Sequence, residues 1–176
     1  MKIRRLSPSD DRGNFDCGDV DLNRFFRKYA GQNQFRQHIG TTYIAEGDDG
    51  MAVGFATVVP GQVETDGLPA AVRKGLPRYP MPVLRLARLG VDVRAQRRGV
   101  GKALLRFVLE LSLQMTREFG CIGVIVDSLP SAVPFYRTLG FVPLALVSGR
   151  LPDRPEPGVL FLSVKEIEAA ARTPAR

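Results

Sequence analysis

The sequence predicts an α/β fold with a mixed central sheet of about six or seven strands and about four flanking helices. Two observations support this class. Apolar segments with strand patterns alternate along the chain with segments whose apolar residues recur at helical spacing. Of the 176 residues, 44% are hydrophobic, which is enough for the core of one domain. We expect that domain over residues 1–165 and a tail over 166–176, whose alanines and charges allow a frayed helix.

Elements can be assigned in order through the N-terminal half. Leu22, Phe25, Phe26 and Tyr29 recur at helical spacing, and Gly47–Gly50 has the composition of a hairpin turn. The prolines and glycines that follow the hairpin indicate a long loop with one helical turn, and such loops are often functional. The predicted elements are a strand over 2–6, a helix over about 19–37, paired strands over 41–45 and 51–59, and a loop over 60–82.

The C-terminal half begins with a strand that leads through a short turn into the longest helix. Polar residues follow one stripe of this helix, and the rest of its surface is apolar, so we expect it to pack on the sheet. The next strand is continuously apolar, as expected when both of its faces are covered. The predicted elements are strands over 83–93, 121–126, 141–147 and 159–164, and helices over about 99–119 and 131–139.

The turn before the long helix has the chemistry of an anion site. The first N–H groups of a helix have no partner within it, and the helix dipole favours negative charge there. Glycines in the turn let an anion approach the backbone, and arginines add permanent charge. The candidate anion-binding residues are Gln96, Arg97, Arg98, Gly99, Val100, Gly101 and Lys102.

Two better-known phosphate motifs are excluded at this turn. A P-loop requires Gly-x-x-x-x-Gly-Lys followed by Ser or Thr, but Gln96 stands at the first glycine position and Ala103 follows Lys102. A dinucleotide-binding motif requires Gly-x-Gly-x-x-Gly, but Leu104 stands at the third glycine position. The anion site therefore belongs to another class.

Composition limits the remaining possibilities. Two cysteines and one histidine provide neither a disulfide framework nor a metal site. No apolar run reaches the ~18 residues of a membrane span, and no signal-peptide pattern follows the N-terminus. We therefore expect a cytoplasmic protein that binds no metal.

Positive charge is concentrated in one segment. Residues 41–71 contain five acids and no Lys or Arg, whereas residues 72–106 contain ten Lys or Arg and a single acid, Asp92. Such a segment suits a polyanionic partner such as a nucleic acid. The alternative interpretation is an ordinary solvated face.

Two motifs resemble those of the GNAT acetyltransferases. Gln96-Arg-Arg-Gly-Val-Gly101 is similar to the family's coenzyme A pyrophosphate loop, and Ala132-Val-Pro-Phe-Tyr-Arg-Thr-Leu-Gly-Phe141 is similar to its Ala-x-x-Phe-Tyr-x-x-x-Gly-Phe motif. The N-terminal half, with Phe15-Asp-Cys-Gly18 and Leu22-Asn-Arg-Phe-Phe26, resembles the TacT-like tRNA-acetylating toxins within that family. The resemblance extends from about residue 6 to about residue 164.

The resemblance implies an activity and partners. It implies an enzyme that uses acetyl-CoA to acetylate the α-amino group of aminoacyl-tRNA and so blocks translation. It also implies a ribbon-helix-helix antitoxin and a homodimer. Two alternatives remain open: a GNAT enzyme for a small-molecule amine or a protein N-terminus, and a non-catalytic coenzyme-binding regulator.

The resemblance also assigns roles at the site. The backbone of Val91 and Val93 would pair with the pantetheine arm of the coenzyme, with one N–H facing the thioester carbonyl. Asp92 lies between them and is expected mainly as a structural hydrogen-bond acceptor. Tyr136 would be the general acid, because a tyrosine pKa of about 10 exceeds a thiol pKa of about 8.5 and the hydroxyl keeps its proton at neutral pH. Without the motif, a packed helix aromatic would be the simpler interpretation of Tyr136.

Arginines and lysines of the basic segment are the candidate tRNA contacts, because guanidinium groups pair well with phosphates. Arg85 and Arg88 should point to opposite faces of a strand, so at least one of them is expected to have a structural partner. The candidates are Arg73, Lys74, Arg78, Arg85, Arg88 and Arg94.

Overall fold

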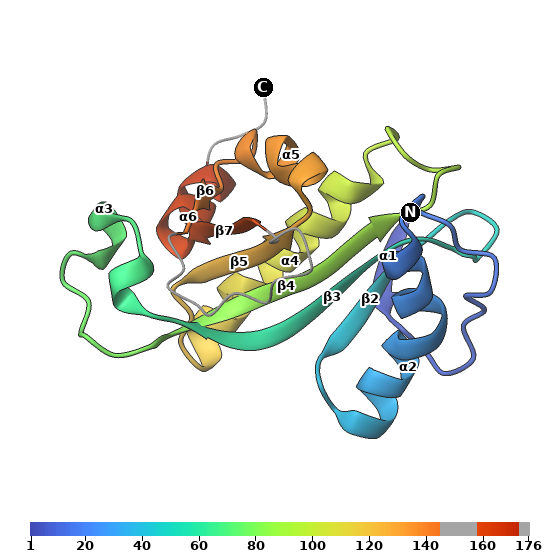
Figure 1. Ribbon diagram of the computed structural model, residues 1–176, viewed down its shortest axis with the longest axis horizontal. Coiled ribbons are helices and arrows are strands. Elements are labelled where there is room, and N and C mark those ends of the chain that lie inside the picture. Colours follow the sequence, from blue (N-terminus) through green and yellow to red (C-terminus); the bar gives the residue numbers. More distant parts are fainter. Residues whose placement is uncertain (145–157, 173–176) are drawn as a thin grey trace. The chain divides into compact units, whose positions relative to one another are not determined.

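The computed structural model describes residues 1–144 and 158–172. Within these ranges, seven strands form one sheet in the order β1-β2-β3-β4-β5-β7-β6, which confirms the predicted α/β class and strand number (Figure 1). The strands are β1 (Lys2–Arg5), β2 (Thr41–Glu46), β3 (Ala52–Val63), β4 (Met81–Val91), β5 (Gly123–Ser128), β6 (Val142–Pro143) and β7 (Gly158–Ser163).

Helices connect these strands at the predicted places. The α-helices are α1 (Val20–Arg24), α2 (Ala30–Gln32), α3 (Ala70–Arg73), α4 (Val100–Glu118), α5 (Val133–Arg137) and α6 (Val164–Arg172). Short 3₁₀ turns cover Thr65–Gly67 and Pro130–Ala132, and π-helical turns cover Phe25–Tyr29 and Asn33–Gln37. No helix among the described residues is long and apolar enough to cross a membrane.

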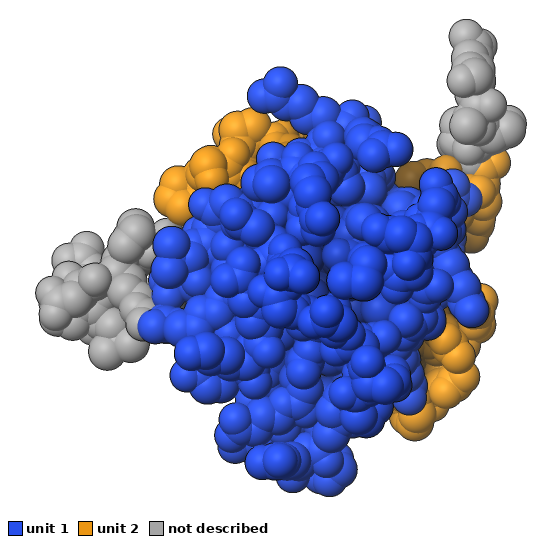
Figure 2. Space-filling model, turned by 90° about the vertical axis from the view of Figure 1, so that its right-hand side faces the viewer, with its two compact units in different colours: residues 1–59, 86–110 blue, residues 60–85, 111–176 orange. Residues whose placement is uncertain are grey.

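The chain contains two compact units, each made from two stretches of sequence (Figure 2). Unit 1 comprises Met1–Val59 and Leu86–Glu110, and unit 2 comprises Pro60–Arg85 and Leu111–Arg176. The chain therefore passes from one unit to the other within β4 and within α4. The single domain expected over residues 1–165 stays a prediction.

Unit 1 is built on an antiparallel arrangement of β1, β2 and β3. Ile3 lies opposite Ala45 in the first pair of strands, and Ile44 lies opposite Phe55 in the second. Three aromatic rings form the centre of the core: Phe26 stacks on Phe55 with ring centroids 4.4 Å apart, and Phe15 meets Phe26 edge-on at 4.7 Å. Phe15 belongs to the stretch that precedes α1, so this stretch is anchored in the core.

The helical region predicted over 19–37 is real but is not a continuous α-helix. It begins after Asp19, whose carboxylate accepts a hydrogen bond from the N–H of Leu22 at 2.8 Å as an N-cap. Two π-helical turns interrupt it, which shifts the following residues around the helix axis. Phe25 and Phe26, adjacent in sequence, are both buried. The region ends at His38, which takes a left-handed φ of 55°.

Unit 2 centres on the antiparallel pair β5–β7. A side chain at Gly123 could not fit there, because a Cβ atom would lie 2.4 Å from the carbonyl oxygen of Leu162 and 2.5 Å from the Phe161 ring. Buried side chains around this pair include Val83, Ile125 and Phe161. The close approach of the two strands thus depends on the absence of a side chain at residue 123.

Several boundaries differ from those predicted. Strand β3 continues four residues further than expected, to Val63, and β5 begins at Gly123 and not at residue 121. Helix α6 begins at Val164, where Ser163 and Glu166 form a capping box: the N–H of Ser163 donates to the Glu166 carboxylate at 3.1 Å, and the N–H of Glu166 donates to the Ser163 hydroxyl at 3.3 Å. The end of the strand predicted over 141–147 lies outside the described residues, from residue 145 on. The end of the tail predicted over 166–176 lies outside them from residue 173 on.

Candidate active site

The turn between β4 and α4 is shaped as an anion-binding concavity, and we call residues Gln96–Lys102 the cradle. Two of its residues take left-handed backbone conformations, Arg97 with φ 60° and Gly99 with φ 85°. Arg98 lies between them with a negative φ, so the backbone alternates in handedness. Alternation of this kind directs successive N–H groups into one hollow, which is the geometry of an anion nest.

Hydrogen-bond donors in the cradle are available to a ligand. Within the described part of the chain, the backbone N–H groups from Arg97 to Lys102 form no hydrogen bond to a residue outside this turn and helix α4. They lie at the N-terminus of α4, a helix of 19 residues whose dipole favours negative charge at this end. The side chains of Arg97, Arg98 and Lys102 are exposed around them. The residues present fit the pyrophosphate of a coenzyme.

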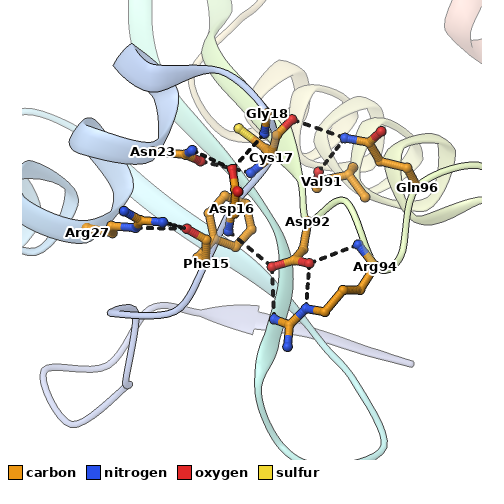
Figure 3. Close-up of polar contacts among 10 residues, drawn as sticks. All are labelled: Phe15, Asp16, Cys17, Gly18, Asn23, Arg27, Val91, Asp92, Arg94 and Gln96. Atoms are coloured by element: carbon orange, nitrogen blue, oxygen red, sulfur yellow. Dashed lines mark hydrogen bonds and ion pairs between the residues drawn. The ribbon is translucent and has the colours of Figure 1, made fainter.

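Asp92, immediately before the cradle, is a buried carboxylate at the centre of a hydrogen-bond network (Figure 3). Its side chain is 1% exposed. Arg94 binds both of its oxygens, with Nε at 2.8 Å and Nη2 at 2.9 Å, and the N–H groups of Arg94 and Asp16 donate to it at 3.0 and 3.1 Å. These hydrogen bonds, led by those from the Arg94 side chain, lower the pKa of Asp92 to about 2 despite its burial. The expectation that Asp92 acts as a hydrogen-bond acceptor agrees with this geometry.

The low pKa of Asp92 predicts how the stability depends on pH. The folded protein holds this pKa at about 2, below the ordinary value of 3.8, so the carboxylate stabilises the fold above the ordinary pKa. That contribution is lost as pH falls from 3.8 toward 2. We expect the gap in unfolding free energy between the wild type and Asp92→Asn to narrow between about pH 6 and about pH 3, as measured by urea unfolding. A gap that stays constant over that range would contradict the assignment.

Val91, the last residue of β4, and Val93, in the turn that follows, differ in what they can offer a ligand. The N–H group of Val93 donates to the carbonyl oxygen of Asp16 at 2.7 Å and is satisfied within the chain, so the predicted N–H donor to the thioester carbonyl stays a prediction for Val91. The carbonyl oxygen of Val91 accepts a hydrogen bond from the Gln96 side chain at 3.1 Å. A role for the Val91 backbone in binding the pantetheine arm stays a prediction.

Tyr136 lies on α5 in unit 2 and is largely buried, with 5% of its surface exposed. Its ring meets those of Phe135 and Phe141 edge-on, at centroid distances of 5.1 and 5.5 Å. Burial raises its pKa to about 12, so the hydroxyl is protonated at neutral pH. Among the described residues, the Tyr136 hydroxyl has no hydrogen-bond partner. Tyr136 thus carries a proton that it can donate.

Three of the predicted tRNA-binding arginines are engaged within the protein. Arg85 forms a two-pronged ion pair with Asp127, with Nε at 2.7 Å and Nη2 at 2.6 Å from the carboxylate oxygens. The guanidinium carbon of Arg88 lies 4.1 Å from the centroid of the Phe25 ring. Arg94 is held by Asp92. The expectation of a structural partner for Arg85 or Arg88 is confirmed, and these arginines are less free to meet a phosphate.

The other three candidates surround a hollow in unit 2, which we call the basic hollow. It has a volume of about 630 Å³ and lies in the connection between β3 and β4. The Thr65 hydroxyl, which lies within hydrogen-bonding distance (2.9 Å) of the carbonyl oxygens of both Pro77 and Tyr79, fixes one wall. Asp66 is the acid among its lining residues. The lining residues are Thr65, Asp66, Ala70, Arg73, Lys74, Leu76 and Arg78.

Sequence reasoning did not assign a role to the segment before α1. Asp16 and Cys17 contact the turn that follows β4, although 76 or more residues separate them from it. Phe15-Asp-Cys-Gly18 was a sign of the resemblance, but its partners could not be read from the chain. His38 is exposed, and both cysteines are free thiols. The described residues contain no group of His, Cys, Asp or Glu that could hold a metal ion.

The fold and the cradle together define the class of the protein. The acetyltransferase (GNAT) domain family matches residues 38–143, more than half of the chain. The protein belongs to the GNAT acetyltransferase family.

Individual relatives narrow the comparison. The chain is 34% identical to a tRNA-acetylating toxin of Mycobacterium tuberculosis (strain ATCC 25618 / H37Rv), over 72% of this chain and 74% of the relative. It is 25% identical to a probable toxin TacT of Sinorhizobium fredii (strain NBRC 101917 / NGR234), over 81% and 84% of the two chains. A solved structure of AtaT complexed with acetyl-methionyl-tRNAfMet is similar with a TM-score of 0.84 at 26% identity, covering 97% of this chain and 98% of that one. A tyrosine-to-phenylalanine variant of KacT is similar with a TM-score of 0.83 at 26% identity, covering 96% and 98%.

Proposed function

We propose that this protein is a toxin that transfers the acetyl group of acetyl-CoA to the α-amino group of an aminoacyl-tRNA, and so blocks translation. The observation that carries the proposal is the cradle, an anion nest at the start of α4. Similarity to a tRNA-acetylating toxin and to AtaT bound to an acetylated tRNA supports tRNA as the acceptor.

The chemistry requires three contributions from the chain. Acetyl-CoA supplies the acetyl group as a reactive thioester. The N–H groups of the cradle hold its pyrophosphate, and Arg97 and Arg98 neutralise the remaining charge. The amine nitrogen attacks the carbonyl carbon, the C–N bond forms and the C–S bond breaks, and the Tyr136 hydroxyl gives its proton to the leaving sulfur. The ester lowers the pKa of the α-amino group, so a fraction of the amine is neutral and nucleophilic near pH 7. After the attack the nitrogen releases its proton to water, and Tyr136 regains its proton from water.

The basic hollow is the best candidate for contact with the tRNA backbone. Arg73, Lys74 and Arg78 are exposed, and no described residue forms an ion pair with them. Asp66 alone opposes their charge within the lining. A concentration of cations without intramolecular partners suits a chain of phosphates.

Replacing these cations should weaken tRNA binding in a salt-dependent way. A plot of log K for tRNA binding against log salt concentration has a negative slope. We expect Arg73→Ala and Arg78→Ala each to make this slope less steep by about 1 if each side chain neutralises one phosphate. Filter binding of aminoacyl-tRNA over a series of salt concentrations measures this slope. Arg106→Ala is the matched control, because Arg106 is an exposed arginine paired with Glu110 on α4 and should leave the slope unchanged. If the wild type and the three variants all give the same slope, the basic hollow is not part of the tRNA interface.

Three further assignments within this proposal rest on the resemblance of the sequence to TacT-like toxins. A ribbon-helix-helix antitoxin would neutralise the protein, the protein would form a homodimer, and it would work in the cytoplasm. Co-expression with the product of a small neighbouring gene, followed by co-purification, tests the first. Light scattering of the purified protein tests the second.

The acceptor can be identified by direct labelling. The protein is incubated with acetyl-labelled coenzyme and with aminoacyl-tRNA, free amines or peptides in parallel. We expect label on the aminoacyl-tRNA. Label on a small amine or a peptide N-terminus alone would establish the alternative GNAT activity, and coenzyme binding with no transfer to any acceptor would indicate a regulator.

A further inference from the structure

The segment from Phe15 to Gly18, which we call the N-terminal segment, is attached directly to the turn that carries the cradle (Figure 3). The N–H of Asp16 donates to the Asp92 carboxylate at 3.1 Å, and the N–H of Val93 donates to the Asp16 carbonyl at 2.7 Å. The Gln96 side chain donates to the carbonyl oxygens of both Cys17 and Val91, each at 3.1 Å. The segment is therefore joined to the turn by one main-chain hydrogen bond and by the side chains of Asp92 and Gln96.

The opposite side of the N-terminal segment is fixed by the helical region. Arg27 donates to the carbonyl oxygen of Phe15 through Nε at 2.8 Å. Asn23 donates to the Asp16 carboxylate at 2.7 Å and accepts from the N–H of Cys17 at 2.8 Å. The Phe15 ring is anchored in the core against Phe26. The segment is thus a rigid link between the helical region and the cradle.

Asp92 is the junction of this link. Its carboxylate oxygens accept hydrogen bonds from both sides of the link. The N–H of Asp16 donates from the N-terminal segment, and the N–H and the side chain of Arg94 donate from the turn. A buried carboxylate with several donors is geometrically demanding, because each donor must remain directed at it to offset the cost of burying its charge. Loss of the charge would release the Arg94 side chain, which is 65% exposed, to solvent and would leave the segment and the turn without their common acceptor.

We propose that Asp92 is a positioning residue, which holds the turn in the conformation that binds the coenzyme by tying it to the N-terminal segment. The proposal rests on the proposed function, because it takes the cradle as the coenzyme site. It has a reciprocal consequence: if the attached segment favours coenzyme binding, a bound coenzyme must favour the attached segment to the same degree. Asp92 does not touch the reacting atoms in this proposal.

The first test measures CoA affinity by calorimetry in the wild type and in the Asp92→Asn variant. Asparagine keeps the size of the side chain but places an NH₂ group against N–H donors. We expect the Kd for CoA to rise about tenfold, the factor that corresponds to losing a hydrogen bond to a charged group. In steady-state acetylation, KM for acetyl-CoA should rise by a similar factor while kcat changes less than about threefold.

Asp10→Asn is the matched control. Asp10 is a partly buried aspartate of unit 1, whose carboxylate binds Arg4 at 2.9 and 3.0 Å and accepts from the N–H of Ser7 at 2.6 Å. Its loss should destabilise the fold in the same manner and leave the Kd for CoA unchanged. A purely structural role for Asp92 predicts equal behaviour of the two variants, and equal Kd values would overturn the proposal.

The second test needs no variant. Hydrogen exchange of the wild type, followed with and without saturating CoA, should show about tenfold slower exchange of the Asp16 and Val93 amides when CoA is bound. Protection confined to residues 97–102 would overturn the proposal while leaving the cradle as the coenzyme site. A wild type that binds no CoA at all would overturn the proposed function, and this inference with it.

Discussion

Tyr136→Phe should reduce acetyl transfer to aminoacyl-tRNA by about a hundredfold while leaving the Kd for acetyl-CoA almost unchanged. General-acid catalysis contributes about that factor or more, and the substitution removes the hydroxyl proton but keeps the ring. Contacts of the ring with Phe135 and Phe141 would be preserved, so the fold should be unaffected. Single-turnover kinetics with labelled acetyl-CoA separates the transfer step from binding.

A second tyrosine provides the control for this experiment. Tyr79 is 60% exposed, and Tyr79→Phe removes a hydroxyl of the same kind from the surface. We expect wild-type transfer rates from that variant. Undiminished transfer by Tyr136→Phe would show that another group, or water, protonates the leaving sulfur.

Phe26→Ala should have the largest effect on stability among single substitutions in unit 1. The Phe26 ring is completely buried, stacks on Phe55 and meets Phe15 edge-on. Truncation of a buried phenylalanine removes apolar contacts and leaves a cavity, at a cost of about 3–5 kcal/mol. Urea unfolding at constant pH measures the change. Because Phe15 begins the N-terminal segment, CoA affinity should fall as well.

Phe119→Ala is the corresponding surface substitution. Phe119 follows α4 and is 81% exposed, so its removal should change the unfolding free energy by no more than about 0.5 kcal/mol. If Phe26→Ala and Phe119→Ala lose similar amounts of unfolding free energy, the stacked aromatic rings of unit 1 do not dominate the stability of its core.

The sequence was sufficient for the local features of the fold and for the cradle. Strands and helices were predicted where apolar periodicity is strong, as in α4, and the cradle was predicted because its residues are contiguous. Boundaries were less accurate where a neighbouring strand decides the end of pairing, as at Val63 in β3. The two π-helical turns between Phe25 and Gln37 were not predicted, because the spacing of apolar residues along the sequence does not distinguish a π-helical turn from an α-helical one.

Contacts distant in sequence account for what the sequence could not predict. Six cations of the basic segment were equivalent as candidates, and the structure distinguishes them. Arg85 has an acidic partner 42 residues away, and Arg88 lies over an aromatic ring of the helical region. The hydrogen bond of the Val93 N–H likewise depends on Asp16, which comes from the other of the two stretches of sequence that make up unit 1. Composition and spacing contain no information about such pairings.

The left-handed conformation of Arg97 has a consequence for the thermodynamics of coenzyme binding. An L-residue other than glycine at a φ of 60° costs about 1–2 kcal/mol, and the folded chain bears this cost before any ligand arrives. A flexible loop would instead lose conformational entropy during association, which would weaken the affinity. Binding to the cradle should therefore carry a small entropic penalty for the loop. Arg97→Gly would relieve the strain in the free protein and transfer part of that ordering cost to the binding step.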